Sequence, residues 1–112
     1  MELKIEERYH LIVLKLNGKL VGGPFSEELN TTLHKLIIQE KLNIIADMSN
    51  VSFINSTGLG ILISGYTTMK NADGQFKLAA IPDKIDGILS VTKLNQIFEQ
   101  FNTVEEAINS FK

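Results

Sequence analysis

Few residues in this chain could carry out chemistry. The 112-residue sequence contains no cysteine and only two histidines, His10 and His34. The lack of cysteine excludes a disulfide framework, a thiolate nucleophile and a Cys-ligated metal site. Neither histidine has a visible Asp or Ser partner for acid–base or nucleophilic catalysis. We interpret both histidines as structural and expect neither a cofactor nor a bound metal.

Carboxylate pairs and glycines also favour a structural interpretation. Glu27-Glu28 and Glu105-Glu106 fall in the first turns of predicted helices, where negative charge complements the helix dipole. Gly58, Gly60 and Gly65 match neither of the common phosphate-binding loops, because the spacing differs and no lysine follows them. The sequence therefore predicts that this protein is not an enzyme.

Composition and charge narrow the class of protein further. The net charge of −2 provides no basic field for nucleic acid. The N-terminus lacks the apolar stretch of a signal peptide, and the run 51–69 is too interrupted to span a membrane. We predict a single domain, residues 1–112, in the cytoplasm, with no direct contact to nucleic acid and no membrane span.

One segment, residues 47–60, stands out from this background. It starts at the end of an apolar strand and runs into the beginning of a helix, where Asn55, Ser56 and Thr57 are consecutive. One interpretation is structural: a side-chain oxygen caps the helix, and the glycines after it allow close packing. The other is functional: an exposed hydroxyl at a helix N-terminus is a phosphorylation site, because the dipole tolerates a dianion there. We expect Thr57 to turn inward or cap the helix, which leaves Ser56 as the acceptor.

Alternating strand and helix patterns must position this segment. Period-2 and helical spacing predict the order βββαβαβαβα, an α/β fold with a mixed, mostly parallel sheet and about four helices. The predicted strands are 3–6, 10–16, 19–21, 42–48, 75–81 and 96–101, and the predicted helices begin near residues 24, 56, 82 and 103. Asn17-Gly18 is predicted to be a turn between the second and third strands, and 49–55 a loop. Asp47 is interpreted as a cap for that loop.

The last helix has its own start signal. Thr103-Val104-Glu105-Glu106 predicts a capping box, with Thr103 as the N-cap and Glu106 reaching back.

Taken together, these features resemble a known family. The pattern Asp-x-Ser-x-Val-x-Phe-Ile-x-Ser-Thr-Gly-Leu-Gly at 47–60 is similar to the signature of STAS domains, the anti-sigma factor antagonists of bacteria. The resemblance covers essentially the whole chain and implies a STAS-like fold. It implies that Ser56 is the phosphorylated serine, with an anti-sigma factor that is also a serine kinase and a PP2C-type phosphatase as partners. The residues that this resemblance assigns to partner binding are Asn55, Thr57, Gly58, Leu59 and Gly22.

The resemblance breaks at Asn55, where the family usually has Asp. Asparagine keeps the size and the capping oxygen but removes a charge beside the hydroxyl. This favours a second hypothesis, a STAS scaffold or accessory subunit of a sensory complex or lipid transporter without phosphorylation. A third, a small hydrolase with Ser56 on a nucleophile elbow, lacks the first glycine of that motif because Ile54 occupies its place. The sequence leaves a homodimer open.

Overall fold

The computed structural model describes residues 1–111, which form one five-stranded sheet with helices on both of its faces. The elements in chain order are β1 Glu2–Arg8, β2 Leu11–Leu20, α1 Pro24–Ile38, β3 Asn43–Ile54, α2 Ser56–Asn71, β4 Gln75–Ala79, α3 Asp83–Val91, the 3₁₀ helix η1 Leu94–Gln96, β5 Gln100–Phe101 and α4 Val104–Asn109.

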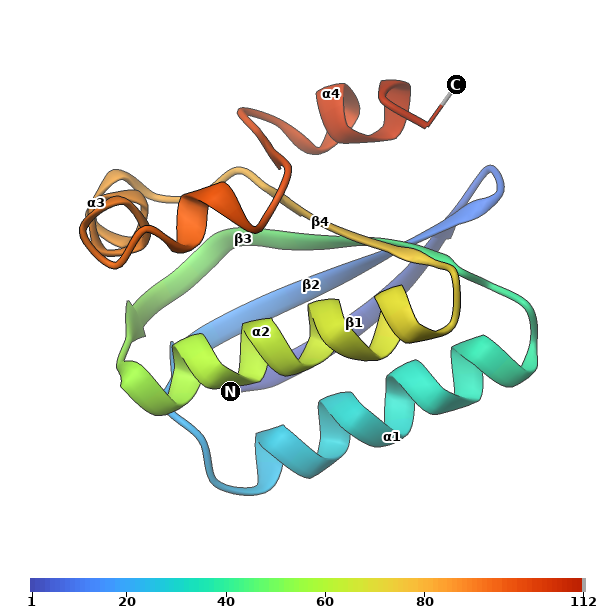
Figure 1. Ribbon diagram of the computed structural model, residues 1–112, viewed down its shortest axis with the longest axis horizontal. Helices are drawn as coiled ribbons and strands as arrows, with labels where there is room; N and C mark the ends of the chain where they lie inside the picture. Colours follow the sequence, from blue (N-terminus) through green and yellow to red (C-terminus); the bar gives the residue numbers. More distant parts are fainter. Residues whose placement is uncertain (112) are drawn as a thin grey trace.

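The strands lie in the sheet in the same order as in the chain, β1-β2-β3-β4-β5 (Figure 1). β1 and β2 are antiparallel and are joined by the tight turn at Tyr9 and His10, whereas the other three pairs are parallel. The predicted mixed, mostly parallel sheet is confirmed, with β3 at its centre. Because the helices α1 and α2 each connect two parallel neighbours, they pack back onto the sheet between them.

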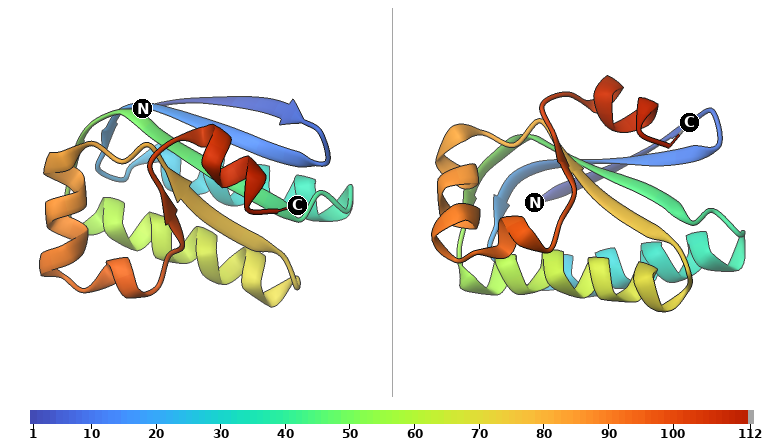
Figure 2. Two further views of the ribbon diagram at one scale, coloured as in Figure 1. Left: turned by 90° about the horizontal axis from the view of Figure 1, so that it is seen from above. Right: turned by 45° about the horizontal axis from the view of Figure 1, so that its top comes forward.

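Two hydrophobic cores of unequal size lie on the two faces of the sheet. Helices α1 and α2 run side by side on one face, and α4 lies on the other (Figures 1 and 2). The larger core joins α1, α2 and α3 to the sheet through residues such as Leu33, Ile44 and Leu62. The smaller core joins α4 to the sheet through Val13 and Ile108, among others. β2 is therefore buried on both faces, with Leu14 in the larger core and Val13 in the smaller one.

The predicted turn at Asn17-Gly18 is wrong. Both residues lie inside β2, which continues to Leu20, so the first three predicted strands are only two. Gly18 has a φ of +109°, and the register against β3 shifts immediately after it. The backbone freedom of glycine is used here for an irregularity within a strand rather than for a chain reversal.

The predicted loop 49–55 is also mostly wrong, because β3 continues to Ile54. β3 has one extra residue relative to β2 at two places. The first lies between Asp47 and Asn50, and the second lies between Val51 and Phe53. Such bulges hold polar residues without ending the strand. At the first bulge, the Ser49 amide donates to Asp47 Oδ1 at 3.0 Å, so Asp47 caps a bulge instead of a turn.

The C-terminal part of the chain has the predicted order of elements, but two strands are shorter than predicted, and β4 ends at Ala79. The strand predicted for 96–101 is reduced to Gln100–Phe101, because η1 occupies Leu94–Gln96 after Lys93, whose φ is +62°. Thr103 caps α4 as predicted, and its Oγ1 accepts a hydrogen bond from the Glu106 amide at 3.1 Å. Glu106 reaches back to the amide of Asn102 at 3.2 Å, one residue before the N-cap.

Candidate functional site

The candidate site is the start of α2, which comes directly after the end of β3. Asn55 is the N-cap, with extended backbone angles of −118° and −175°. Its Oδ1 accepts a hydrogen bond from the Gly58 amide at 2.9 Å, and its carbonyl accepts one from the Leu59 amide at 2.9 Å. Of the three small polar residues, Asn55 is therefore the one that caps the helix.

Ser56 is the first residue of α2, and its side chain is exposed. The first four amides of a helix have no partner within it, and Asn55 satisfies the one at Gly58. Within residues 1–111, neither the Ser56 hydroxyl nor the amides of Ser56 and Thr57 make a hydrogen bond. The hydroxyl is thus accessible beside two free donors, an arrangement suited to an added anion.

The first turn of α2 also differs in charge from those of the other α-helices in the described part of the chain. α1 has Glu27 there, α3 has Asp83 and Asp86, and α4 has Glu105 and Glu106. α2 has no acidic residue in its first turn. Its positive dipole end therefore has no carboxylate of its own to complement it.

Gly58 lets α2 begin very close to the end of β2. A Cβ at this position would lie 1.9 Å from the Leu20 carbonyl oxygen and 2.9 Å from Cγ1 of Ile54. No side chain larger than hydrogen fits without a shift of the backbone. The prediction that this glycine permits close packing is confirmed, and a role in partner binding stays a prediction.

Gly22 lies against Thr57, which brings two predicted partner-binding residues together. A Cβ on Gly22 would lie 2.7 Å from Thr57 Cγ2, and the φ of Gly22 is +105°. Thr57 is exposed and does not cap the helix, so the expectation that it turns inward or caps is wrong. The reason is that Asn55 supplies the cap, which leaves the Thr57 methyl to contact the Gly22 loop.

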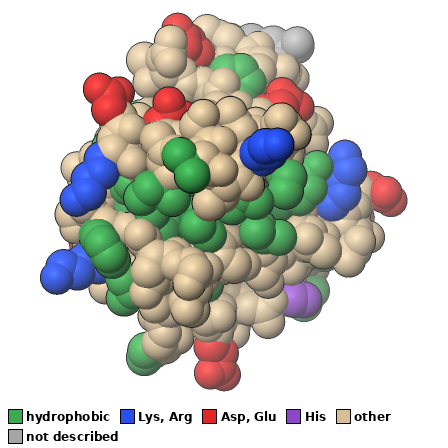
Figure 3. Space-filling model, turned by 60° about the vertical axis from the view of Figure 1, so that its left-hand side comes forward, with side chains coloured by type: hydrophobic (Ala, Val, Ile, Leu, Met, Phe, Trp, Pro, Cys, Tyr) green, Lys and Arg blue, Asp and Glu red, His purple; other side chains and the backbone are tan. Residues whose placement is uncertain are grey.

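Apolar side chains surround this helix start on the surface. Phe53 is 42% exposed and Val21 39% exposed, and Leu59 is half-buried against the main core. The Lys84 ammonium lies 5.9 Å from the centre of the Phe53 ring. Figure 3, which brings the α3 end of the molecule forward, shows a band of hydrophobic side chains with basic side chains at its two sides.

The sequence alone does not separate Phe53 from the core or single out Val21. The alternation in β3 is interrupted by the bulge opposite Gly18 and Lys19, so the period-2 pattern misplaces Phe53.

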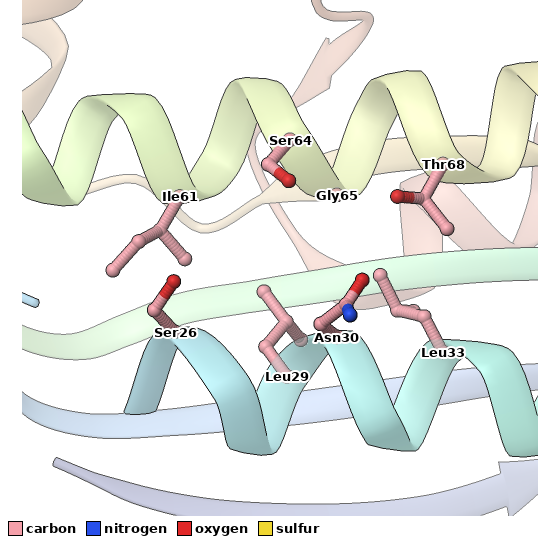
Figure 4. A pocket seen from close by; sticks show the side chains of 8 residues that line it. All are labelled: Ser26, Leu29, Asn30, Leu33, Ile61, Ser64, Gly65 and Thr68. Carbon is pink, nitrogen blue, oxygen red and sulfur yellow. The ribbon is translucent and has the colours of Figure 1, made fainter. Parts of the chain in front are cut away.

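A small cavity lies between α1 and α2, and Ser56 is not among the residues that line it. The cavity between α1 and α2 has a volume of about 10 Å³, which is room for about one water molecule. Ser26 and Asn30 of α1 and Ser64 and Thr68 of α2 line it (Figure 4). This cavity is too small for a substrate-sized ligand.

Other expectations about chemistry can be placed in the structure. His10 and His34 are both exposed, and the His34 ring nitrogen Nδ1 lies 2.8 Å from the Asn30 carbonyl oxygen of the same helix. Among residues 1–111, no three His, Cys, Asp or Glu side chains group together as a metal site would require. Over the same residues, every helix is too short or too polar to cross a membrane.

Comparisons with known proteins add to this geometry. The sequence model of the STAS domain family matches residues 2–107. The chain is similar to the anti-sigma F factor antagonist of Paenibacillus polymyxa, with 20% identity over all of this chain and 97% of that protein. It is also similar to the anti-sigma-B factor antagonist of Listeria monocytogenes, with 25% identity over 62% of this chain and 60% of that protein.

Solved structures share the fold. The unphosphorylated form of the anti-sigma factor antagonist SpoIIAA superposes with a TM-score of 0.73 at 21% identity, covering 98% of this chain and 97% of that one. The phosphorylated form of SpoIIAA from Bacillus gives a TM-score of 0.76 at 20% identity, covering 99% and 100%. The fold of this chain is therefore the fold of those structures.

Proposed function

Because the chain belongs to the STAS domain family, we propose that it is an anti-sigma factor antagonist controlled by phosphorylation of Ser56. With Ser56 unmodified, the protein binds an anti-sigma factor and frees a sigma factor for transcription. The observation that carries the proposal is the Ser56 hydroxyl, which is exposed and unbonded at a helix start that has no carboxylate.

The physical basis of the switch is a difference in affinity between two states of one surface. A phosphate adds about −1.5 to −2 charges and three acceptor oxygens at Ser56. The α2 dipole and the free amides of Ser56 and Thr57 receive that charge without refolding. The apolar surface of Phe53 and Val21 beside it is suited to a desolvated contact, in which an unpaired charge is unfavourable.

The proposed partners come from the family resemblance. A serine kinase that is also the anti-sigma factor binds the α2 start and phosphorylates Ser56, and a PP2C-type phosphatase reverses the reaction. Asn55, Thr57, Gly58, Leu59 and Gly22 form or shape the contact surface. The exchange takes place in the cytoplasm and involves no direct contact with DNA.

Asn55 supports a second candidate function. The Asn55 side chain caps α2 through its oxygen, as an aspartate would, but lacks the charge that the family usually has beside the serine. A protein that binds its partner through this surface without being phosphorylated needs only the cap. In that case the chain is a scaffold or accessory subunit of a sensory complex or a lipid transporter.

Co-purification from the native cell, with intact-mass measurement of the purified chain, identifies the partner and the phosphorylation state together. Tandem mass spectrometry of the protein after treatment with that kinase then locates the phosphate. We expect it on Ser56, and phosphate on Thr57 alone would contradict the assignment.

Calorimetric titration against the same partner, with nucleotide present, tests the switch. Ser56→Ala is expected to bind like wild type, because alanine is small and neutral. Ser56→Asp is expected to bind roughly 30-fold to several-thousand-fold more weakly, because an uncompensated charge enters a desolvated contact. Equal affinity for all three proteins would leave the scaffold function as the better one.

Asn55→Asp is the companion variant, since it keeps the cap and restores the charge. If the switch operates, this variant is phosphorylated faster than wild type, while its affinity for the partner changes little. Asn55→Ala serves as the control that removes the cap and adds no charge.

A further inference from the structure

The outer edge of β1 is an unpaired strand edge. β1 is the first strand in the sheet order and, in the described structure, pairs only with β2. Figure 2 shows β1 along one margin of the sheet, with no element beyond it. Every second residue of such a strand directs its amide and carbonyl outward, which makes the edge a template for another strand.

The side chains of β1 alternate between the two faces of the sheet. Leu3 and Ile5 lie opposite Leu16 and Leu14, on the side of the larger core, and Ile5 is 55% exposed at the edge. The other face carries four charged residues in the order minus, plus, minus, plus: Glu2, Lys4, Glu6 and Arg8.

We propose that β1 pairs in antiparallel fashion with β1 of a second copy of this chain, in a register centred on Ile5. Each Lys4 then lies opposite Glu6 of the second copy, and each Glu2 lies opposite its Arg8. The two Ile5 side chains meet at the symmetry axis, where their exposed apolar surface is covered. The pair thus has four opposite-charge contacts and no like-charge contact.

Other registers of the same two strands are less favourable. A shift that centres the pair on Lys4 puts the two Lys4 side chains opposite each other and pairs Glu2 with Glu6. A shift that centres it on Glu6 puts the two Glu6 side chains together and pairs Lys4 with Arg8. The two-fold axis of such a dimer is perpendicular to the sheet, so two residues that lie opposite each other must be on the same face. A register centred between two residues would oppose residues from different faces and does not occur.

Contacts within one chain indicate which pair decides the register. Arg8 already binds Glu105 at 2.7 Å, and Glu6 binds Lys15 at 3.1 Å through its Oε2. The Lys4 side chain is 66% exposed, and its ion pair with Glu2 is long at 3.9 Å. Lys4 is therefore free to turn toward the second copy, and the contact from Lys4 to Glu6 carries the charge selectivity.

Sedimentation of the full chain over ~1 µM to ~1 mM measures the dimer, which is expected to be weak because a seven-residue strand forms the contact. Lys4→Glu is expected to raise the dissociation constant roughly tenfold or more, because two attractive cross-strand pairs become repulsive. Glu6→Lys has the same effect for the same reason. Two experiments restore the opposite charges. An equal mixture of Lys4→Glu and Glu6→Lys chains should form a mixed dimer, and the double variant should dimerise like wild type.

A cross-link tests the register in the otherwise unchanged chain, which has no cysteine of its own. Opposed antiparallel residues have Cα atoms about 4.5 to 5.5 Å apart, so Ile5→Cys forms a disulfide-linked dimer on oxidation. Leu3→Cys is the control: in this register the two introduced thiols lie four residues apart, about 13 Å, and do not join. A chain that stays monomeric at ~1 mM, a dimer that Lys4→Glu leaves unchanged, or equal cross-linking of the two cysteine variants would overturn the proposal.

Discussion

The starts of α2 and α4 are built in the same way up to one point. Each helix has a small polar N-cap whose oxygen binds the amide three residues later: Asn55 binds Gly58 at 2.9 Å, and Thr103 binds Glu106 at 3.1 Å. Both N-caps have extended backbone angles. By local geometry the two helix starts are alike.

The two helices differ in the residues of the first turn after the cap. In α4, the Glu105 carboxylate binds Arg8 at 2.7 Å, and Glu106 accepts from the Asn102 amide at 3.2 Å. The N-terminal end of α4 therefore carries its own negative charge, and the Glu105 carboxylate connects it to β1 through Arg8. In α2, the corresponding positions are Thr57 and Gly58, and Ser56 precedes them with an unbonded hydroxyl.

This difference shows how one motif serves two purposes. A helix start with its own carboxylates is stabilised and closed to further anions. A start with the cap alone is stable enough to fold, while its remaining amides and its dipole stay available to an added charge. The start of α2 has fewer contacts within the chain than the start of α4, and it is the surface that we propose as the switch.

The largest expected effect comes from substituting Gly58, the α2 position that corresponds to Glu106 of α4. Gly58→Ala would place a Cβ 1.9 Å from the Leu20 carbonyl oxygen, where only backbone movement gives relief. We expect a loss of about 3 kcal/mol or more in unfolding free energy and a melting temperature lower by roughly 10 °C or more. Thermal and urea unfolding monitored by circular dichroism measure both.

Gly60→Ala is the matched control in the same helix. Nothing lies within 4 Å of a Cβ on Gly60. Alanine there is expected to stabilise the protein by roughly 0.5 to 1 kcal/mol, because it lowers the entropy of the unfolded chain and favours helix. A Gly58→Ala protein as stable as wild type would contradict the close approach of α2 to β2.

Removing the two caps has a smaller effect, which is expected to be similar at both helix starts. Asn55→Ala and Thr103→Ala each remove one capping hydrogen bond and are expected to lower the unfolding free energy by about 1 kcal/mol. Urea unfolding of the two variants and of their double mutant measures this. Because the caps share no contact in the described structure, the two losses should add; a strongly non-additive double mutant would show that the helix starts are coupled.

Much of the fold was predictable because its signals are local. The apolar run 42–48 predicted a strand, which the structure places in β3 at the centre of the sheet, and helical spacing predicted α1 and α2. The α4 cap was predictable from Thr103 and Glu106 alone. The geometry of the α2 start was predictable in part, since three adjacent polar residues predicted a cap but did not select Asn55.

The sequence-based predictions are wrong where contacts with residues distant in the sequence determine the local structure. Asn17-Gly18 has the local chemistry of a turn, yet pairing with β3 keeps both residues extended in β2. Asp47 and Ser49 are polar enough for a loop, yet a bulge holds them in β3. Phe53 could not be assigned to the surface, because the second bulge, and not the alternation of residue types, sets its direction.

Adding a negative charge to the first turn of α2 is expected to change the unfolding free energy by less than the loss of a cap does, and to increase it. Ser56→Asp gives the helix the first-turn carboxylate that α4 already has, and it should stabilise the protein by about 0.3 to 1 kcal/mol. The melting temperature should then rise by roughly 1 to 4 °C at low salt, and less at high salt. Ser56→Asn, similar in size but neutral, is the control. A rise of equal size in the control would point to side-chain capping instead of charge.

The smallest expected effect is the dependence of stability on pH. It should differ between the charged residues on the α4 face of β1 and the start of α2. The hydrogen bond from Lys15 lowers the pKa of Glu6, with a smaller contribution from Arg8, and Glu105 raises the pKa of Arg8. The first turn of α2 has no titratable side chain. Acid should therefore weaken the contacts of Glu6 with Lys15 and Arg8 on the α4 face of the sheet and leave the α2 start unchanged.

Because the folded-state pKa of Glu6 lies below its ordinary value of 4.5, the stabilisation from its ion pairs is complete above about pH 4.5 and disappears as the pH falls through the lowered value. The groups are exposed, so the slope of unfolding free energy against pH should be shallow. Glu6→Gln should flatten that slope in urea unfolding between about pH 2.5 and 6, whereas Glu28→Gln, an exposed carboxylate with no ion pair in residues 1–111, should not. Over the same range, the protection factor against amide exchange, which corrects for the intrinsic effect of pH on exchange, should fall at Val13, the β2 partner of Glu6, and stay constant at Gly58. An equal fall in protection at both amides would mean that acid acts on the whole domain and not on the Glu6 contacts.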